Sequence, residues 1–392
     1  MQPFDSLTVV SLEQAVAAPF ATRQLADLGA RVIKIERPGT GDFARAYDAS
    51  VRGQSSYFVW LNRSKESITL DLKKPGGAEI LDRLLARADV FVQNVAPGAA
   101  DRLGTGPAEL HARYPRLIIC SVSGYGSTGP YADRRAYDLL VQSEAGLLSL
   151  TGTPDQPSKV GISVADIAAG MYAYSGILTA LLARASHGRG AVVEISLFDA
   201  LAEWMSAPAA YTAYGGAAPA RTGPHHASIA PYGPVTTRDA ETVYLAIQNP
   251  REWTRLCADV LKRPELATDS RFATNPLRVT NRDALDQAIA TVAGGLTATE
   301  LIARLDAAQI AHARMNTMAD FVAHPQLAAR NRWRDIETPS GPIKTLVPAV
   351  SVDNEAPRLG AVPALGAHTE PILRELGYGA EAVAAWRAEG TI

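Results

Sequence analysis

The chain has 392 residues, of which 47% are hydrophobic and 20% charged, so it can build about two domain cores and is not an extended disordered chain. Lys and Arg number 38 and Asp and Glu number 40, and the net charge of −2 excludes a global attraction to nucleic acid or to an anionic membrane. Aromatic residues make up only 7%, which argues against a stacking surface for single-stranded nucleic acid.

Strand and helix patterns alternate over the first half of the chain. The predicted strands span residues 7–12, 31–35, 67–72, 90–93, 117–122 and 191–197. The predicted helices span residues 20–28, 76–88 and 167–186, and a further helix passes through Leu201 and Trp204. Strand, helix and strand within so few residues predict parallel βαβ units, and their repetition predicts an open α/β sheet of Rossmann-like type.

The second half begins with an irregular stretch. Residues 207–234 are rich in Ala, Pro, Gly and His and show no period, which predicts a linker or a functional loop. Residues 235–323 then predict a smaller α+β unit, with one strand and several helices. Its predicted elements are a strand at 243–247 and helices at 252–261, 282–292 and 298–308. Segments punctuated by Pro and Gly follow, and we expect a last helix at 369–376.

The two cysteines, Cys120 and Cys257, stand in apolar surroundings and form neither a disulfide scaffold nor a CxxC zinc motif. We therefore expect a reducing, cytoplasmic location. Residues 1–12 lack a basic region and a long apolar region, so we expect no signal peptide. The most apolar stretches carry Asp, Glu, Arg or Gly within the length that a bilayer demands, so we expect no transmembrane helix.

Several common catalytic motifs are missing from the sequence. The first strand–helix turn reads Gln14-Ala-Val-Ala-Ala-Pro19 and contains no glycine, which argues against a nicotinamide dehydrogenase. The sequence contains no GxxxxGKS/T, HExxH or GxSxG pattern. His225 and His226 are adjacent and cannot face one metal as an i, i+4 pair would, so we expect no metal site.

Asp166 is the only charged residue between Lys159 and Arg184, in a stretch of apolar and small residues. It lies where the pattern predicts the start of a helix. An aspartate at the start of a helix is most often an N-cap, which is a purely structural role. The helix end would also keep the carboxylate ionised, and small neighbours would let a substrate approach, so Asp166 is also a candidate nucleophile, although the local sequence favours the N-cap.

Basic residues follow the predicted strand ends in the first third of the chain. Arg37 and Lys73 each come after a strand, and Arg45 and Arg102 follow at intervals. Because the carboxyl ends of parallel strands form the ligand crevice of an open α/β sheet, these side chains are candidates for binding phosphates. The alternative is ordinary solvated surface charge.

Six ordered blocks of this sequence resemble the class III CoA-transferases, the family of the formyl-CoA:oxalate and crotonobetainyl CoA-transferases. The blocks are Leu28-Gly-Ala-Arg-Val-Ile-Lys-Ile-Glu-Arg-Pro-Gly-Thr-Gly-Asp42, residues 62–73, residues 89–104, Ser121-Val-Ser-Gly-Tyr-Gly-Ser-Thr-Gly-Pro130, the segment around Asp166, and Leu365-Gly-Ala-His-Thr-Glu370. The resemblance runs almost from end to end.

The resemblance implies that Asp166 is the catalytic nucleophile, which forms a mixed anhydride and then an aspartyl-CoA thioester. CoA and its acyl esters enter as substrates, so we expect no permanently bound cofactor. The residues that match CoA-binding positions of the family are Arg37, Lys73, Asn94, Arg102, Leu103 and Arg135. On the acid side, Val16 and Gln14 stand where the oxalate enzyme has glutamine and histidine, and Tyr137 matches a tyrosine beside the nucleophile.

The oxalate enzyme also has a glycine-rich loop over its intermediates. Here that region reads Gly223-Pro-His-His-Ala-Ser-Ile-Ala-Pro-Tyr232, so His225, His226 and Ser228 become candidate acid-binding residues. Loops of this kind occur in dicarboxylate-using members. We therefore expect succinyl-CoA as donor and a C4–C5 dicarboxylate, such as mesaconate, itaconate or citramalate, as acceptor.

The resemblance further implies a Rossmann-like large domain made from residues 1–206 and 324–392, a linker and active-site loop at 207–234, and a small inserted α+β domain at 235–323. It also implies an interlocked homodimer. We expect no nucleic-acid or membrane partner.

Two alternatives remain open on the sequence. The related α-methylacyl-CoA racemases move an α-proton with an Asp and a His, but this chain has Tyr137 where that His belongs. A phenol with a pKa of about 10 is a poor second base near neutral pH, which disfavours racemisation. The other alternative is a CoA-binding protein without turnover, against which the intact Asp166 block argues.

Overall fold

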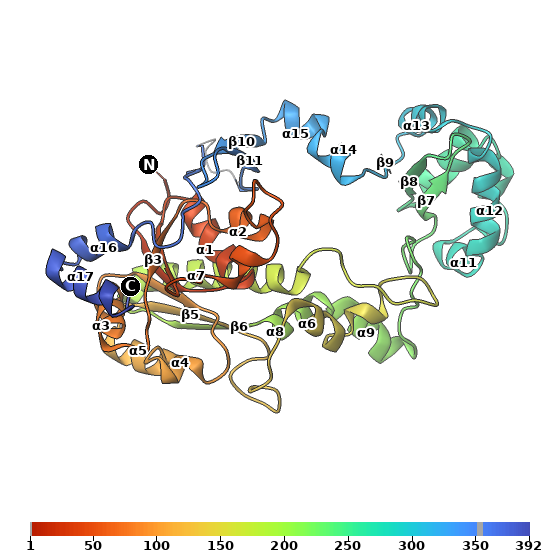
Figure 1. Ribbon diagram of the computed structural model, residues 1–392. Coiled ribbons are helices and arrows are strands. Elements are labelled where there is room, and N and C mark those ends of the chain that lie inside the picture. Colours follow the sequence, from red (N-terminus) through yellow and green to blue (C-terminus); the bar gives the residue numbers. More distant parts are fainter. Residues whose placement is uncertain (1, 351–355) are drawn as a thin grey trace. The chain divides into compact units, whose positions relative to one another are not determined.

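The computed structural model describes residues 2–350 and 356–392, which form two compact units (Figure 1). Unit 1 contains Met1–Ala145, Gly161–Ser206 and Leu327–Ile392, and unit 2 contains Gly146–Val160 and Ala207–Gln326. The expected boundary is wrong for residues 146–160, which the sequence assigned to the large domain. They join unit 2 because Gly152 and Thr153 accept hydrogen bonds from Gly223 and Arg221.

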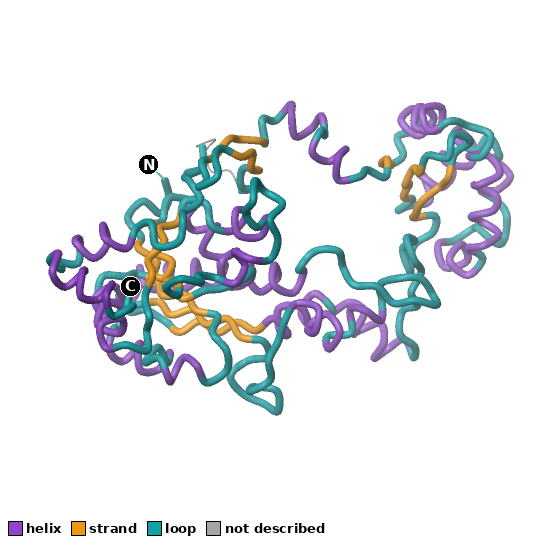
Figure 2. Tube along the Cα trace, in the orientation of Figure 1, coloured by secondary structure: helices purple, strands orange, loops and turns teal. Residues whose placement is uncertain are grey.

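Unit 1 is built on a six-stranded parallel sheet with the strand order β3-β2-β1-β4-β5-β6, which confirms the predicted α/β fold class (Figure 2). The strands are β1 (Thr8–Leu12), β2 (Arg31–Glu36), β3 (Lys65–Thr69), β4 (Val90–Gln93), β5 (Ile118–Ser123) and β6 (Val192–Ser196). The order reverses between β1 and β4, because the chain runs outward from β1 through β2 to β3 and then returns to the other side of β1.

Helices cover both faces of this sheet, so most side chains of its central strands are buried. Val10, Ile33 and Phe91 pack toward the side of α3 (Pro75–Leu85), α5 (Pro107–Arg113), α16 (Thr369–Glu375) and α17 (Ala380–Ala388). The helices α1 (Ala17–Asp27) and α7 (Val164–His187) contact the strands on the other side.

The C-terminal part of unit 1 contains elements that the sequence reading missed. A hairpin of β10 (Trp333–Ile336) and β11 (Ile343–Leu346) precedes α16, and α17 follows the helix expected to be the last. In α17, Val383 packs into the core of the sheet and Trp386 lies against it. The helix escaped prediction because two glycines, Gly377 and Gly379, stand just before it.

The other elements of unit 1 are short. They are a 3₁₀ turn (Phe43–Ala46), α2 (Ser56–Leu61), α4 (Ala99–Arg102), α6 (Asp138–Glu144), α8 (Leu197–Trp204) and, at its end, α15 (Pro325–Ala329), which begins in unit 2.

Unit 2 has its own apolar core, which includes Val243, Leu256, Leu285 and Leu301. Its antiparallel sheet contains β7 (Tyr232–Thr236), β8 (Thr242–Ala246) and β9 (His312–Arg314). Its helices are α9 (Ser206–Gly215), α10 (Pro250–Arg255) with a π turn (Leu256–Val260), α11 (Asn275–Thr280), α12 (Arg282–Ala293), α13 (Ala298–Ala307) and α14 (Met318–Val322), with 3₁₀ turns at Leu147–Ser149 and Pro264–Ala267. The stretch expected to be irregular, 207–234, therefore contains a helix and the start of a strand.

The longest helix, α7, has 24 residues and is the one helix of the described chain that is long and apolar enough to cross a membrane by length and composition alone. It packs closely on α1 through Gly170, an arrangement also found in core helices. A methyl group at this position would stand 2.6 Å from the carbonyl oxygen of Ala17 and 3.0 Å from Cβ of Phe20.

Gly170→Ala is therefore expected to lower the free energy of unfolding by about 1–3 kcal/mol, because a backbone carbonyl cannot yield without moving α1. This cost outweighs the helix propensity that alanine gains. Urea unfolding followed by circular dichroism measures the change. Ser175→Ala, at an exposed position of the same helix, is the control and should change the free energy by less than about 0.5 kcal/mol. An unchanged midpoint for Gly170→Ala would contradict the close approach.

Candidate functional site

The candidate site lies in unit 1, where the strand order reverses between β1 and β4. Ligands of open α/β folds bind beyond the carboxyl ends of the strands at such a point. Here Gln14 and Asn94, which follow β1 and β4, are tied together. The backbone N–H of Gln14 donates to Oδ1 of Asn94 at 2.8 Å, and Nδ2 of Asn94 donates to the carbonyl oxygen of Gln14 at 2.8 Å. Asn94 thus fixes the β1–α1 turn, a role that the sequence did not indicate.

The β1–α1 turn, residues 13–16, brings the start of α1 against the start of α7. Ala15 has φ of 62°, a left-handed conformation that is unusual for alanine. Val16 is only 2% exposed and packs with Phe20 and Leu61, and Ile167 of α7 lies against this cluster. The turn therefore lies against the first turn of α7, which also contains the residue that precedes Ile167.

That residue is Asp166, in the first turn of α7, and it is not an N-cap. The N-cap is Ser163, whose side chain makes no capping bond. The free N–H groups are instead met by Asp138, whose Oδ1 accepts from the backbone of Ala165 at 2.8 Å and of Asp166 at 3.3 Å. The interpretation of Asp166 as an N-cap is therefore wrong, and its carboxylate is available for another role. Among the described residues, none donates a hydrogen bond to it.

The environment of Asp166 disfavours its charged form. Burial, and to a smaller extent the negative charge of Asp138, raise its pKa to about 7. A carboxylate with few hydrogen bonds and a raised pKa is poorly stabilised, and it is for that reason a better nucleophile than an ordinary aspartate.

Two tyrosines complete this surface. Tyr137, the N-cap of α6, has a 64% exposed side chain, as a substrate contact requires. Tyr47 was not singled out from the sequence. Burial raises its pKa to about 12, with smaller contributions from the charges of Asp42 and Asp166 and from Tyr137, which shows that the phenol lies near all three. Its ring also contacts Tyr57, at 5.6 Å between centroids. No sequence motif indicates that Tyr47 lies near these residues.

Some of the predicted CoA-binding residues lie on the same side of unit 1 as Asn94. Arg37 and Lys73 follow β2 and β3, beside Asn94 after β4, and so share the carboxyl edge of the sheet. The exposed cations Arg37, Lys73, Arg102 and Arg135 form no ion pair with any described residue. Leu103 is the C-cap of α4. Arg45, in contrast, is held by Glu36 at 2.7 Å and is not available as a free phosphate ligand.

The three loop candidates lie in unit 2. Nδ1 of His225 stands 3.9 Å from Oδ2 of Asp286, and the ring of His226 stacks on Tyr232 at 5.2 Å between centroids. The backbone N–H of Ser228 donates to Nδ1 of His226 at 3.2 Å. These contacts order the loop within unit 2, and its role toward Asp166 remains a prediction. Within residues 2–350 and 356–392, no group of three or more His, Cys, Asp or Glu side chains is arranged to hold a metal ion.

Comparison with known proteins gives a consistent result. The family model described as CoA-transferase family III matches residues 4–369. An acetyl-CoA:oxalate CoA-transferase of Acetobacter aceti is 39% identical over 87% of this chain and 89% of its own length. The human succinyl-CoA:glutarate CoA-transferase is 33% identical over 96% of this chain and 86% of its own. A succinyl-CoA–D-citramalate CoA-transferase of Chloroflexus aurantiacus is 34% identical over 96% of this chain and 94% of its own.

The fold is shared with a solved structure as well. A CAIB/BAIF family protein from Brucella suis has 36% sequence identity and a TM-score of 0.83, and the match covers 96% of this chain and 99% of that one.

Proposed function

The chain belongs to CoA-transferase family III and is a transferase enzyme, and we propose that it moves CoA from succinyl-CoA to a small C4–C5 dicarboxylate through Asp166. The observation that carries the proposal is the Asp166 carboxylate, which lies at the start of α7 without a hydrogen-bond donor among the described residues and beside the β1–α1 turn. The relatives that use succinyl-CoA with glutarate and with D-citramalate support the substrate class.

In the proposed mechanism, an oxygen of Asp166 attacks the thioester carbonyl of the donor, and the C–S bond breaks. CoA leaves as thiolate and a mixed anhydride remains on the enzyme. The thiolate attacks the aspartyl carbonyl carbon, the donor acid leaves as carboxylate, and an aspartyl-CoA thioester forms. The acceptor carboxylate then attacks this carbon and expels the thiolate, which leaves a second mixed anhydride between Asp166 and the acceptor. The thiolate attacks the acceptor acyl carbon of this anhydride, the bond to the aspartyl oxygen breaks, and Asp166 leaves as a carboxylate. No proton is consumed in the cycle, and covalent catalysis divides a difficult exchange into easier steps.

We assign the CoA moiety to the exposed cations at the carboxyl edge of the sheet. Guanidinium and ammonium groups without an acidic partner are suited to phosphate oxygens. Binding energy from this distant part of the substrate would help to drive the formation of the anhydride. The proposed CoA-contacting set is Arg37, Lys73, Asn94, Arg102, Leu103 and Arg135.

The acid side of the proposed pocket is formed by Gln14, Val16 and Tyr137. A buried valine at position 16 gives an apolar wall in place of an amide, which suits the carbon skeleton of a C4–C5 acid better than it suits oxalate. Tyr47 supplies a second phenol near the nucleophile. His225, His226 and Ser228 stay predicted acid-binding residues, as the resemblance implies.

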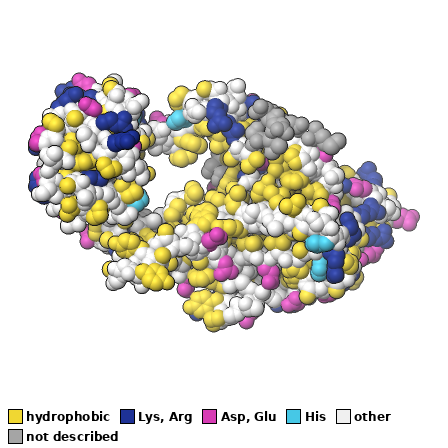
Figure 3. Space-filling view, turned by 180° about the vertical axis from the view of Figure 1, so that it is seen from behind, with side chains coloured by type: hydrophobic (Ala, Val, Ile, Leu, Met, Phe, Trp, Pro, Cys, Tyr) yellow, Lys and Arg dark blue, Asp and Glu magenta, His cyan; other side chains and the backbone are white. Residues whose placement is uncertain are grey.

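We also propose that the enzyme acts as a homodimer in the cytoplasm. Large hydrophobic side chains are exposed on α6–α8 of unit 1, and hydrophobic side chains cover much of the face shown in Figure 3. A second copy of the chain would cover such a surface. The exposed side chains on these helices include Leu139, Leu140, Met171, Leu182 and Trp204. Both cysteines are free thiols, in keeping with a reducing compartment.

Mass spectrometry of CoA esters tests the substrate class. Incubation with succinyl-CoA and a panel of acids should give new CoA esters of citramalate, itaconate, mesaconate or glutarate, at rates at least about 10-fold above those of monocarboxylates of equal length, because a site built for a second carboxylate is left unpaired by them. Transfer only to bulky acids with neutral tails would contradict the dicarboxylate proposal. Exchange of the α-proton without CoA transfer would contradict the reaction class.

A further inference from the structure

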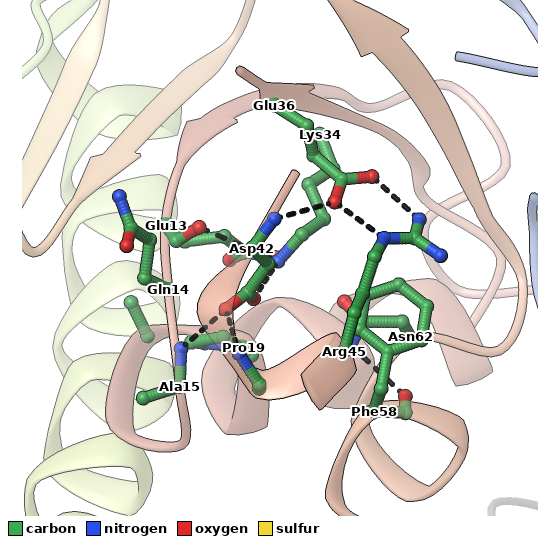
Figure 4. A network of polar contacts seen from close by, with 12 residues as sticks. Glu13, Gln14, Ala15, Pro19, Lys34, Glu36, Asp42, Arg45, Phe58 and Asn62 are labelled. Atoms are coloured by element: carbon green, nitrogen blue, oxygen red, sulfur yellow. Dashed lines mark hydrogen bonds and ion pairs between the residues drawn. The ribbon is translucent and has the colours of Figure 1, made fainter. Parts of the chain in front are cut away.

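Four charged side chains are buried together beside the β1–α1 turn, and Figure 4 shows Glu13, Lys34 and Asp42 among them. Glu13, Lys34, Asp42 and Lys65 are each 3% exposed or less. Lys34 Nζ lies 2.7 Å from Oδ2 of Asp42 and 3.6 Å from Oε1 of Glu13, and Lys65 Nζ lies 2.7 Å from the same Glu13 oxygen. Two carboxylates balance two ammonium groups, which is the condition under which buried charges are tolerated.

Asp42 differs from the other three because its second oxygen accepts hydrogen bonds from backbone N–H groups. Oδ1 accepts the N–H of Ala15 at 3.1 Å and the N–H of Ala44 at 2.9 Å. The first bond holds the left-handed residue of the β1–α1 turn. The second starts the 3₁₀ turn that leads directly into Tyr47. The turn lies against Ile167 in the first turn of α7, and Tyr47 is within electrostatic reach of Asp166, so one buried carboxylate joins two sides of the candidate site.

The position of Asp42 is itself fixed from behind. Its backbone N–H donates to Oε1 of Glu36 at 2.9 Å, and Glu36 is held by Arg45 at 2.7 Å and by the hydroxyl of Ser67 at 2.6 Å. Figure 4 shows Glu36 and Arg45 beside Asp42. The side chain therefore has one orientation, with one oxygen toward Lys34 and the other toward the two backbone donors.

We infer that Asp42 is a positioning residue, which holds the β1–α1 turn and the Tyr47 segment in the one arrangement that suits reaction at Asp166, while Lys34 orients its carboxylate. The inference rests on the proposed role of Asp166. Asp42 touches no reacting atom and acts through Ala15 and Ala44. A carboxylate is required because three donors approach it from two sides, whereas an amide has only one accepting oxygen.

Asp42→Asn tests the inference. In either orientation of the amide, its NH₂ group faces Lys34 or the two backbone N–H groups, so one contact is lost. We expect kcat to fall by about 10- to 100-fold, since a displacement of about 1 Å at the site has a cost of this size. Peptides that cover residues 13–16 and 43–47 should also exchange amide hydrogen faster, as mass spectrometry can measure without any substrate.

Asp27→Asn is the matched control. Asp27 is as fully buried as Asp42 and pairs with Arg23 at 2.9 Å and Arg63 at 2.7 Å, but it holds neither segment. The same substitution there should lower Tm comparably and leave kcat and the exchange of both peptides at the wild-type values. Equal losses of kcat in the two variants at equal loss of Tm would overturn the inference.

A second substitution should restore the activity that Asp42→Asn loses. Lys34→Met in the Asp42→Asn background restores charge balance, since Glu13 keeps Lys65, and it leaves the amide oxygen free for Ala15 and Ala44. The double variant should regain most of the lost kcat and the slow exchange. An Asp42→Asn enzyme with wild-type kcat and unchanged exchange would overturn the inference. Absence of transfer by the wild type with every acid would instead contradict the proposed function, while the exchange data would still report on the turn.

Discussion

Asp166→Ala is expected to lower kcat for CoA transfer by at least about 1,000-fold, because removal of a nucleophile eliminates the covalent path. Asp166→Asn should behave in the same way, since an amide is not a nucleophile at this step. Asp166→Glu should also lose most activity, because its longer side chain displaces the attacking oxygen by about 1 Å. The decrease is measured as the formation of a new CoA ester from succinyl-CoA, with binding of CoA to each variant measured by calorimetry.

The stability of Asp166→Asn separates a chemical defect from a folding defect. A raised pKa in the folded state means that Asp166 contributes to stability while it is protonated, and that this contribution is lost as pH rises through about 7. Asparagine avoids the buried charge, so the variant should be more stable than the wild type at pH 8 and of similar stability at pH 4. Inactivity together with higher Tm at pH 8 would be decisive. A variant with more than a tenth of wild-type kcat would contradict the role of Asp166.

The second large expected effect is a dependence on pH. If the ionised form of Asp166 attacks, kcat/KM should rise with pH and level off above the pKa of about 7. At pH 5, two units lower, the ionised fraction is about one hundredth, so kcat/KM should be about 100-fold lower than at the plateau. An ordinary aspartate, with a pKa of about 3.9, would show no dependence in this range. Initial rates between pH 5 and pH 9 measure the profile.

Asp138→Asn is the matched variant for this profile. It removes the nearby charge that raises the pKa of Asp166, and its remaining amide oxygen can still accept the N–H groups of Ala165 and Asp166. The midpoint of the profile should move to lower pH, by less than the full shift, because burial is the larger cause. A flat profile in the wild type, or a midpoint that stays in place in the variant, would contradict the electrostatic account.

Periodicity in the sequence was sufficient for the strands of the sheet and for α7, because the strands are rich in β-branched and apolar residues and α7 is apolar over most of its length. It was less reliable at the ends. The third strand was expected at 67–72 but lies at Lys65–Thr69, because its register is set by pairing with Glu36 and its neighbours on β2, which no local pattern records.

The candidate site likewise contains residues that the sequence identified and residues that it did not. Asp166 could be singled out from its isolated charge and the resemblance of its block. The roles of Asp138 and Tyr47 could not, because each depends on contacts between segments that are far apart along the chain. Asp138 caps a helix that begins 26 residues later, and Tyr47 approaches that helix from the first third of the chain. Such contacts are produced by the tertiary fold and leave no trace in local spacing.

The division of unit 1 into separate stretches of sequence has a consequence for how the protein is made. All six strands of the sheet and α3 are synthesised before residue 200, but α16 and α17, which cover one end of the same core, come after residue 368. During translation, Ile80 and Leu84 of α3 therefore lack part of their cover while the whole of unit 2 is produced. Because contacts of such long sequence separation form late, the nascent chain leaves this part of its apolar core open to aggregation until its last helices emerge from the ribosome.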